Sequence, residues 1–208
     1  MKLGIFGGTF DPIHNAHVAV ARTVREAFHL DRILLIPNAM PPHKDDTLTA
    51  PFADRLAMVR LAVQNESGLE GSDAEAGTGR SYSIHTIEKV LSSLSSSDQL
   101  YFIIGADAFA EIRTWYRWQD VLSLVTFIVV ARPGHTWVAP SEARVLRLDS
   151  MQLEVSSSAI RERLSVCEQP PELPPSVFEY ICTHKLYGFG SACRPYPQTP
   201  LAADPVSG

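Results

Sequence analysis

The sequence predicts an α/β protein built on a doubly wound parallel sheet, and two observations support this class. Short apolar runs rich in β-branched and aromatic residues alternate along the chain with longer stretches of helical periodicity. The short runs are apolar at nearly every position, as strands are when helices cover both faces of their sheet. In such a sheet, ligands bind beyond the carboxyl ends of the strands, where the strand order reverses.

Each apolar run is expected to form a strand, and turn-forming residues mark where several of these strands end. The first run is followed by two glycines, the second by Pro37-Asn38, and the third by Gly105. The segment 66–80 is rich in Gly, Ser and acidic residues, so it is expected to be a loop or a weak edge strand. The predicted strands are 3–6, 33–36, 100–104 and 125–131, with a weaker one at 145–148.

The helices are expected where apolar residues recur every three or four positions. Such patterns cover 16–28, 51–63, 84–94 and 106–124, and the last is expected to be divided near Trp115. A late helix is expected after Ser156-Ser157-Ser158, because one of these serines can cap its N-terminus and Ile160 and Leu164 follow at helical spacing.

Composition excludes several classes of protein. The 208 residues are 45% hydrophobic and 20% charged, which is typical of a globular chain. We expect one domain over residues 1–190 and a flexible tail over 191–208, where Gly, Pro, Ser and Ala dominate without periodicity. The net charge of −5 provides no basic footprint for a nucleic acid. We expect neither a signal peptide nor a membrane span, and we expect the three widely spaced cysteines to be free thiols in a reducing cytoplasm.

The turn after the first strand carries the strongest functional signal. Gly7 and Gly8 let the main chain approach a ligand closely, and the helix that follows offers free N–H groups to an anion. His14 and His17 are three residues apart, so in one helical turn their rings share a face and can donate to phosphate oxygens. A zinc site of His14, His17 and His43 is the alternative, although no third ligand lies at a familiar spacing.

These residues resemble the signature of the nucleotidyltransferase superfamily. Residues 2–187 are more closely similar to the bacterial nicotinate-nucleotide adenylyltransferases, on motifs that in several cases directly follow a predicted strand. The resemblance implies a Rossmann-like fold of nucleotidyltransferase type with a small C-terminal helical segment. The supporting motifs are residues 7–17, 37–38, 41–44, 81–86 and 104–107, Trp115, 132–134 and 155–161.

The resemblance implies transfer of AMP from ATP to nicotinate mononucleotide, which releases pyrophosphate in NAD biosynthesis. Mg²⁺ is expected to accompany ATP, held by the triphosphate and water rather than by a cage of protein ligands. The residues expected to contact the reacting phosphates are His14, His17, Lys44 and Arg161. ATP is expected at Gly7, Gly8, Thr9, Phe10, Gly105, Asp107, Arg132, Ser156 and Ser157, and the mononucleotide at Asn38, Ser83, Thr86 and Trp115.

Three positions depart from the family pattern, and other functions stay open. Ala16 stands where the motif usually has Gly, His85 where Asp is usual, and Ser158 where Thr is usual. The alternative substrates are nicotinamide mononucleotide and phosphopantetheine, and the alternative classes are a zinc hydrolase and a nucleotide sensor without activity. The sequence leaves open whether the chain forms a homo-oligomer.

Overall fold

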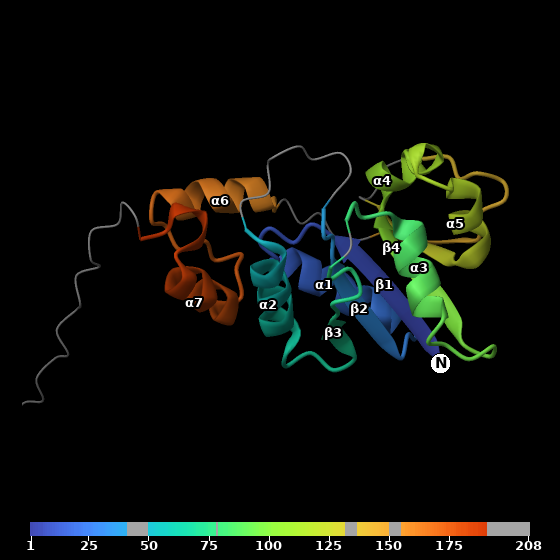
Figure 1. Ribbon diagram of the computed structural model, residues 1–208, viewed down its shortest axis with the longest axis horizontal. Helices are drawn as coiled ribbons and strands as arrows, with labels where there is room; N and C mark the ends of the chain where they lie inside the picture. Colours follow the sequence, from blue (N-terminus) through green and yellow to red (C-terminus); the bar gives the residue numbers. More distant parts are fainter. Residues whose placement is uncertain (41–49, 78, 132–136, 150–154, 191–208) are drawn as a thin grey trace, which may run out of the picture.

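The protein forms one six-stranded parallel sheet with helices on both faces (Figure 1). A computed structural model describes residues 1–40, 50–77, 79–131, 137–149 and 155–190. The strand order is β3-β2-β1-β4-β5-β6, and every neighbouring pair is parallel. The strands are β1 (Lys2–Gly8), β2 (Arg32–Pro37), β3 (Leu69–Gly71), β4 (Gln99–Gly105), β5 (Thr126–Ala131) and β6 (Val145–Asp149). The predicted fold class is confirmed.

Helices α1 and α2 follow the predicted periodicity closely, α3 ends three residues earlier than predicted, and α7 was not predicted from periodicity. The expected division near Trp115 is confirmed, because a short 3₁₀ turn and an irregular connection separate α4 from α5. The helices are α1 (Asn15–Ala27), α2 (Phe52–Val63), α3 (Ser83–Leu91), α4 (Ala106–Ala110), α5 (Trp118–Leu124), α6 (Ser157–Ser165) and α7 (Pro175–His184), with 3₁₀ turns η1 (Ile112–Thr114) and η2 (Leu186–Gly188). Among the described residues of the segment 66–80, β3 is the only regular element, and it lies at the edge of the sheet as expected.

Two hydrophobic cores lie on opposite faces of the sheet. In β4, Ile103 belongs to the core that includes residues of α1, α2, α6 and α7, whereas Phe102 and Ile104 belong to the core that includes residues of α3, α4 and α5. The same alternation occurs in β5, where Ile128 joins the first core and Phe127 the second. Successive side chains of a strand point to opposite faces, so a run that is apolar at every position fills both cores.

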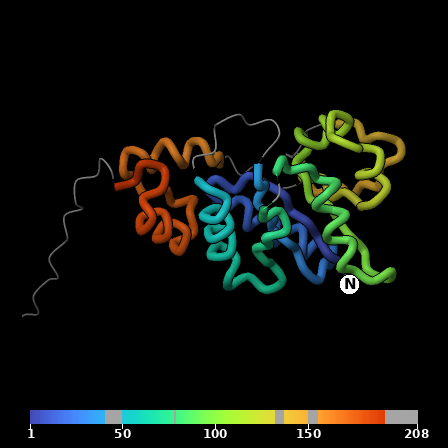
Figure 2. Tube along the Cα trace, in the orientation of Figure 1, coloured from blue at the N-terminus to red at the C-terminus, as the bar shows by residue number. Residues whose placement is uncertain are grey.

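The C-terminal helices extend the first core away from the sheet (Figure 2). Helix α7 lies beside α2, where Tyr180 Oη donates to Asp54 Oδ1 at 2.8 Å and Ser176 Oγ donates to the Leu61 carbonyl at 3.2 Å. These bonds attach the C-terminal helical segment to a helix that packs directly on the sheet. The segment thereby reaches back to the carboxyl end of β1.

The cysteine prediction is partly wrong. Cys182 is a free thiol, but Cys167 takes part in a disulfide. Cysteines that are distant in sequence can meet in the fold, and spacing along the chain does not reveal such a meeting. Within the described residues, no helix is long and apolar enough to span a bilayer. The predicted tail, residues 191–208, lies outside the described residues.

Candidate active site

The site lies where the strand order reverses. Strands β1 and β4 are neighbours in the centre of the sheet. From β1 the chain continues to β2 and β3 on one side, and from β4 it continues to β5 and β6 on the other. The connections that leave these two strands therefore diverge and open a crevice at their carboxyl ends. The turn after β1 and the start of α4 after β4 both border this crevice.

The turn after β1 is packed tightly around Phe10. A Cβ added to Gly8 would lie 2.9 Å from Cζ of the Phe10 ring, so a larger residue at this position would have to displace that ring. Phe10 itself has a positive φ of 49° and is almost fully buried. Its ring lies edge-on to His17, with the ring centroids 5.1 Å apart. A left-handed conformation at a bulky residue is strained, and the surrounding packing holds it in place.

His14 and His17 form a stacked pair at the start of α1. The ring centroids are 3.8 Å apart and the planes differ by 27°, as the three-residue spacing predicts. The His14 main-chain N–H donates to His17 Nδ1 at 3.3 Å. Because Nδ1 of His17 accepts this bond, the proton of the neutral ring resides on Nε2. His17 therefore keeps an Nε2–H group that can donate to an anion.

Burial keeps both rings neutral. It lowers the pKa of His14 to about 4, against a smaller opposing effect of the Glu172 carboxylate. It lowers the pKa of His17 to about 3, and the neighbouring His14 ring adds to this shift. Near neutral pH the pair thus presents hydrogen-bond donors without bringing positive charge into the fold.

The stacked geometry argues against a zinc ion shared by these rings. An imidazole lone pair lies in the plane of its ring, and zinc binds about 2 Å from the nitrogen. Two rings whose planes differ by only 27° and whose centroids are 3.8 Å apart do not direct their lone pairs at one such point. His43, the third residue of that alternative, lies outside the described residues, and the described part of the chain contains no group of three or more potential metal ligands.

Helix α6 brings Arg161 and two serines to the same turn. Ser156 is the N-cap, and its Oγ accepts from the Ala159 N–H at 3.2 Å, so the predicted capping serine is confirmed. Ser157 Oγ donates to the Pro12 carbonyl at 3.0 Å. The Arg161 Nη1 group donates to the Asp11 carbonyl at 2.7 Å.

Arg161 lies just beyond the first turn of α6. Because Ser156 is the cap, α6 begins at Ser157 and Arg161 is its fifth residue. The anionic partner of Arg161 within the protein is Asp11, because Arg161 Nη1 also lies 3.9 Å from Asp11 Oδ2. Any of three consecutive serines could cap the helix, so the sequence did not determine this boundary.

The residues at the end of β4 are exposed toward the crevice end of the sheet. Gly105 is the exposed N-cap of α4, with open space where a Cβ would stand, and Asp107 is exposed in the first turn of α4. Trp115 is half-buried after η1, and its ring meets Phe102 edge to face with centroids 5.9 Å apart. Trp118, three residues on, lies beneath the Arg113 guanidinium at 5.7 Å.

The predicted mononucleotide residues lie on two neighbouring segments. The Asn38 N–H donates to the Gly8 carbonyl at 2.9 Å, which places the end of β2 against the diglycine turn. Ser83 is the first residue of α3. Thr86, one turn in, is buried and donates its hydroxyl to Glu75 Oε1 at 2.7 Å. The Thr86 side chain is therefore bonded within the protein.

Comparisons with known proteins agree with this geometry. The model of the cytidylyltransferase-like family matches residues 5–163. A probable nicotinate-nucleotide adenylyltransferase of Solibacter usitatus is 54% identical over 187 residues, which cover 90% of this chain and 100% of that protein. The chain belongs to the nicotinate-nucleotide adenylyltransferase family.

Other members of the family support the same assignment. The probable enzyme of Oceanobacillus iheyensis is 41% identical over 192 residues, covering 91% of this chain and 98% of that one. Among solved structures, Plasmodium falciparum nicotinic acid mononucleotide adenylyltransferase complexed with NaAD shares the fold. Its TM-score is 0.75 at 22% identity, and the match covers 91% of this chain and 98% of that chain.

Several family motif residues fall outside the described part of the chain. These are Lys44, with its segment 41–49, and Arg132, with its segment 132–136. Of the positions that depart from the family pattern, Ala16 is buried in the first turn of α1. His85 is exposed, and its ring lies edge-on to those of Tyr82 and Tyr116, at 5.7 and 6.0 Å between centroids.

Sequence reasoning missed four residues that shape the site. Arg55 and Glu75 are buried charged groups beneath the crevice, and nothing in their sequence context marks them. Tyr82 and Tyr116 pack together with ring centroids 4.9 Å apart, and Tyr116 is 53% exposed. The signal that could have found the tyrosines is their adjacency to Ser83 and Trp115.

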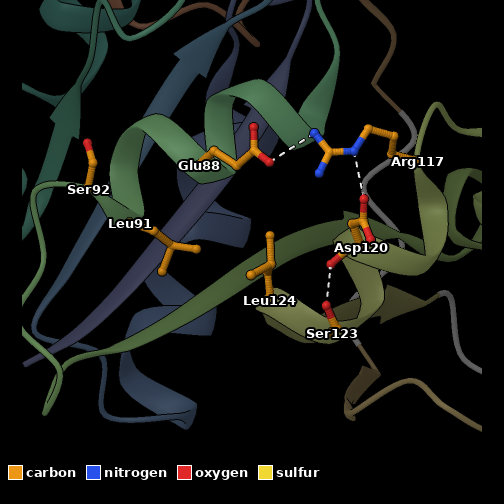
Figure 3. Close-up of a pocket in the computed structure, with 7 residues that line it drawn as sticks. All are labelled: Glu88, Leu91, Ser92, Arg117, Asp120, Ser123 and Leu124. Carbon is orange, nitrogen blue, oxygen red and sulfur yellow. Dashed lines mark hydrogen bonds and ion pairs between the residues drawn. The ribbon is translucent and has the colours of Figure 1, made fainter.

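A cavity of about 480 Å³ opens between α3 and α5, apart from these residues (Figure 3). Arg117 crosses it, with Nη1 at 3.0 Å from Glu88 Oε1 and Nε at 2.6 Å from Asp120 Oδ2. Leu91 and Leu124 line the same space. None of the predicted site residues among those described lines this cavity, so we do not assign the reaction to it.

The histidine pair predicts that the fold loses stability as the pH falls. Below about pH 6.5 the unfolded chain protonates both imidazoles, whereas the folded chain keeps them neutral down to about pH 4 and 3. The unfolded state then binds more protons, so the free energy of unfolding decreases from pH 7 to pH 5. The substitution His17→Asn keeps an acceptor for the His14 N–H, and it removes the imidazole of His17 that binds a proton in the unfolded chain.

Urea unfolding of wild type and His17→Asn at pH 7 and pH 5 checks this prediction. Between pH 7 and pH 5, the free energy of unfolding should decrease by about 2 kcal/mol more for the wild type than for His17→Asn. His184→Asn provides a control, since His184 is exposed on α7. Equal losses for wild type and His17→Asn would show that His17 is not kept neutral by the fold.

Proposed function

We propose that this chain transfers the adenylyl group of ATP to nicotinate mononucleotide, forming nicotinate adenine dinucleotide and pyrophosphate. One observation carries the proposal: two neutral imidazoles stack at a helix start, beside a diglycine turn, at the point where the strand order reverses. Donors in this arrangement suit a polyphosphate. Membership of the nicotinate-nucleotide adenylyltransferase family supports the choice of acceptor.

The chemistry requires positioning more than proton transfer. An oxygen of the mononucleotide 5′-phosphate forms a bond to the α-phosphorus of ATP. The bond between this phosphorus and the oxygen that bridges to the β-phosphate breaks, and pyrophosphate leaves with the electron pair. The attacking phosphate is already anionic near neutral pH, so no strong general base is needed. The protein must align two anions and stabilise the charge that develops between them.

We assign the donors for this alignment to the turn after β1. His17 Nε2–H and the His14 ring face the α-phosphate, and the main chain of residues 7–10 holds the polyphosphate. Lys44, Arg132 and Arg161 contribute positive charge, and Ser156 and Ser157 lie at the start of α6 beside the β- and γ-phosphates. Gly105 and Asp107 border the adenosine. The family motifs support these roles, as do the positions of the described residues after β1, after β4 and at the start of α6.

We assign the mononucleotide to the side of the crevice formed by Asn38, α3 and Trp115. Trp115 stacks on the nicotinate ring, and Ser83 at the start of α3 donates to its carboxylate. The hydroxyl of Thr86 is bonded to Glu75, so we assign Thr86 the role of holding the start of α3 in position rather than of contacting the mononucleotide. The cytoplasmic location expected from the sequence belongs to the proposal, because both substrates are phosphorylated metabolites.

We propose that Mg²⁺ accompanies ATP and is held by phosphate oxygens and water. Magnesium commonly keeps several waters and binds through few carboxylates. Asp11 does not fit such a role, because its carboxylate is buried and accepts from the Ala50 N–H at 3.2 Å and from Tyr187 Oη at 2.9 Å. When bound, the ion would neutralise part of the triphosphate charge.

Release of pyrophosphate by the purified protein tests the function. With ATP and Mg²⁺, we expect pyrophosphate only when a mononucleotide is added, and a higher kcat/KM with nicotinate mononucleotide than with nicotinamide mononucleotide. A protein that binds ATP without turnover in the presence of either mononucleotide would be a sensor rather than an enzyme. Equal or better use of the amide would contradict the assigned acceptor.

Trp115→Ala is expected to raise the KM for the mononucleotide while changing the KM for ATP little. Loss of stacking between a base and an aromatic ring costs about 1 to 3 kcal/mol, which corresponds to roughly five- to 150-fold. Steady-state kinetics with each substrate varied in turn provide the measurement, and Trp118→Ala is the matched control. An effect confined to ATP would show that a different aromatic residue faces the nicotinate ring.

A further inference from the structure

Two buried charged side chains hold the same residue from opposite sides. Arg55 on α2 is 1% exposed, and its Nη2 group donates to the Ala39 carbonyl at 3.3 Å. Glu75 is 6% exposed, and its Oε2 accepts from the Ala39 N–H at 2.9 Å. Ala39 follows Asn38 at the end of β2, so a cation and an anion fix the main chain at the floor of the crevice.

Arg55 also holds the turn that carries the phosphate donors. Its Nη1 group donates to the Thr9 carbonyl at 2.7 Å, and its Nε donates to the Ala50 carbonyl at 3.1 Å. Thus three segments that are separated in sequence meet on one guanidinium. The Thr9 carbonyl belongs to the same peptide group as the Phe10 N–H. A charged donor on this carbonyl polarises the peptide and strengthens its N–H as a donor.

Arg55 bonds to carbonyls rather than to a carboxylate. None of the ion pairs formed by the described residues includes it, although Asp11 is the acid that most favours its charged form. Burial lowers the pKa of Arg55 and is the largest influence on it. A buried cation without a directly bonded carboxylate is costly, so its benefit must come from the geometry or potential that it creates.

Glu75 holds the opposite side of the crevice. Besides Ala39, its carboxylate accepts from the Ser81 hydroxyl and, at 2.7 Å, from the Thr86 hydroxyl. Thr86 lies in the first turn of α3, whose start carries Ser83. Three donors on one carboxylate match the ionised form, which only accepts. Glu75 therefore fixes the helix start assigned to the mononucleotide relative to Ala39.

We propose that Arg55, Ala39 and Glu75 form a relay that sets the spacing between the two substrate half-sites. Arg55 positions the phosphate-binding turn at Thr9, and Glu75 positions the start of α3 at Thr86. Both are positioning residues, since neither contacts a substrate. The proposal rests on the proposed function, because the two half-sites are those assigned to ATP and to the mononucleotide.

Two conservative substitutions separate the ends of the relay. Arg55→Lys keeps the charge but cannot reach three carbonyls with one planar group. We expect it to raise the KM for ATP about tenfold, with a change of less than about threefold in the KM for the mononucleotide. Glu75→Gln keeps the shape but replaces one acceptor oxygen by a donor. We expect Glu75→Gln to raise the KM for the mononucleotide more than the KM for ATP.

Matched controls come from charged residues nearby. Arg60 lies on the same helix and donates to the Gly71 carbonyl at 3.3 Å, and Glu70 pairs with Arg32 at the sheet edge. Arg60→Lys and Glu70→Gln should leave both KM values within about twofold of wild type, since exposed ion pairs contribute little. All variants are assayed well below their own melting temperatures.

The outcomes distinguish the relay from the function itself. A wild type that releases no pyrophosphate with either mononucleotide contradicts the proposed function. If the wild type releases pyrophosphate but the folded variants Arg55→Lys and Glu75→Gln raise both KM values equally, the relay is overturned. It is also overturned if these variants raise neither KM value. If Arg55→Lys does not fold, NMR of the wild-type arginine side chains decides. Pyrophosphate should shift the Arg55 signals and leave those of Arg60 in place, and an unshifted Arg55 overturns its role.

Discussion

The buried carboxylate of Asp11 holds together the part of the molecule on which the site depends. It lies between β1 and α1, yet its Oδ1 accepts from the Ala50 N–H and from the Tyr187 hydroxyl, and Arg161 lies beside its other oxygen. One side chain thus joins the turn after β1 to the segment before α2, to α6 and to η2. Burial and the Asp11 carboxylate raise the pKa of Tyr187, so its hydroxyl remains a donor. The C-terminal helices therefore serve the site, because they bring Arg161 and Tyr187 to the turn after β1.

The electrostatics of the crevice follow from this construction. The chain is acidic overall, so a polyanionic substrate must be met by local donors rather than by a basic surface. The described structure provides such donors in three forms. These are main-chain N–H groups at helix starts, neutral imidazoles whose pKa is lowered by burial, and guanidinium groups tied to main-chain carbonyls. Hydrogen bonds within the protein hold these donors in place, as catalysis by positioning requires.

The sequence predicted those features that depend on local order. Continuous apolar runs identified the central strands, and the three-residue spacing of His14 and His17 predicted their shared face. The sequence predicted that one of three consecutive serines caps α6, but it could not show that Ser156 is the cap, because each of the three can act as one. Arg55 could not be predicted, since one arginine in an amphipathic helix is usually solvated and its three carbonyl partners come from distant segments. Glu75 lies in a polar, glycine-rich segment without periodicity, and the disulfide at Cys167 depends on proximity in space.

The proposed adenylyl transfer depends centrally on His17 being a neutral ring that donates from Nε2 toward the adenylyl group. Nitrogen NMR of histidine-labelled protein at pH 6, with and without an ATP analogue that cannot be hydrolysed, tests this most directly. We expect the free protein to show His17 uncharged, with its proton on Nε2, and we expect the analogue to shift that Nε2 signal. A charged ring, a proton on Nδ1, or an Nε2 signal that does not respond to the bound analogue would contradict the account.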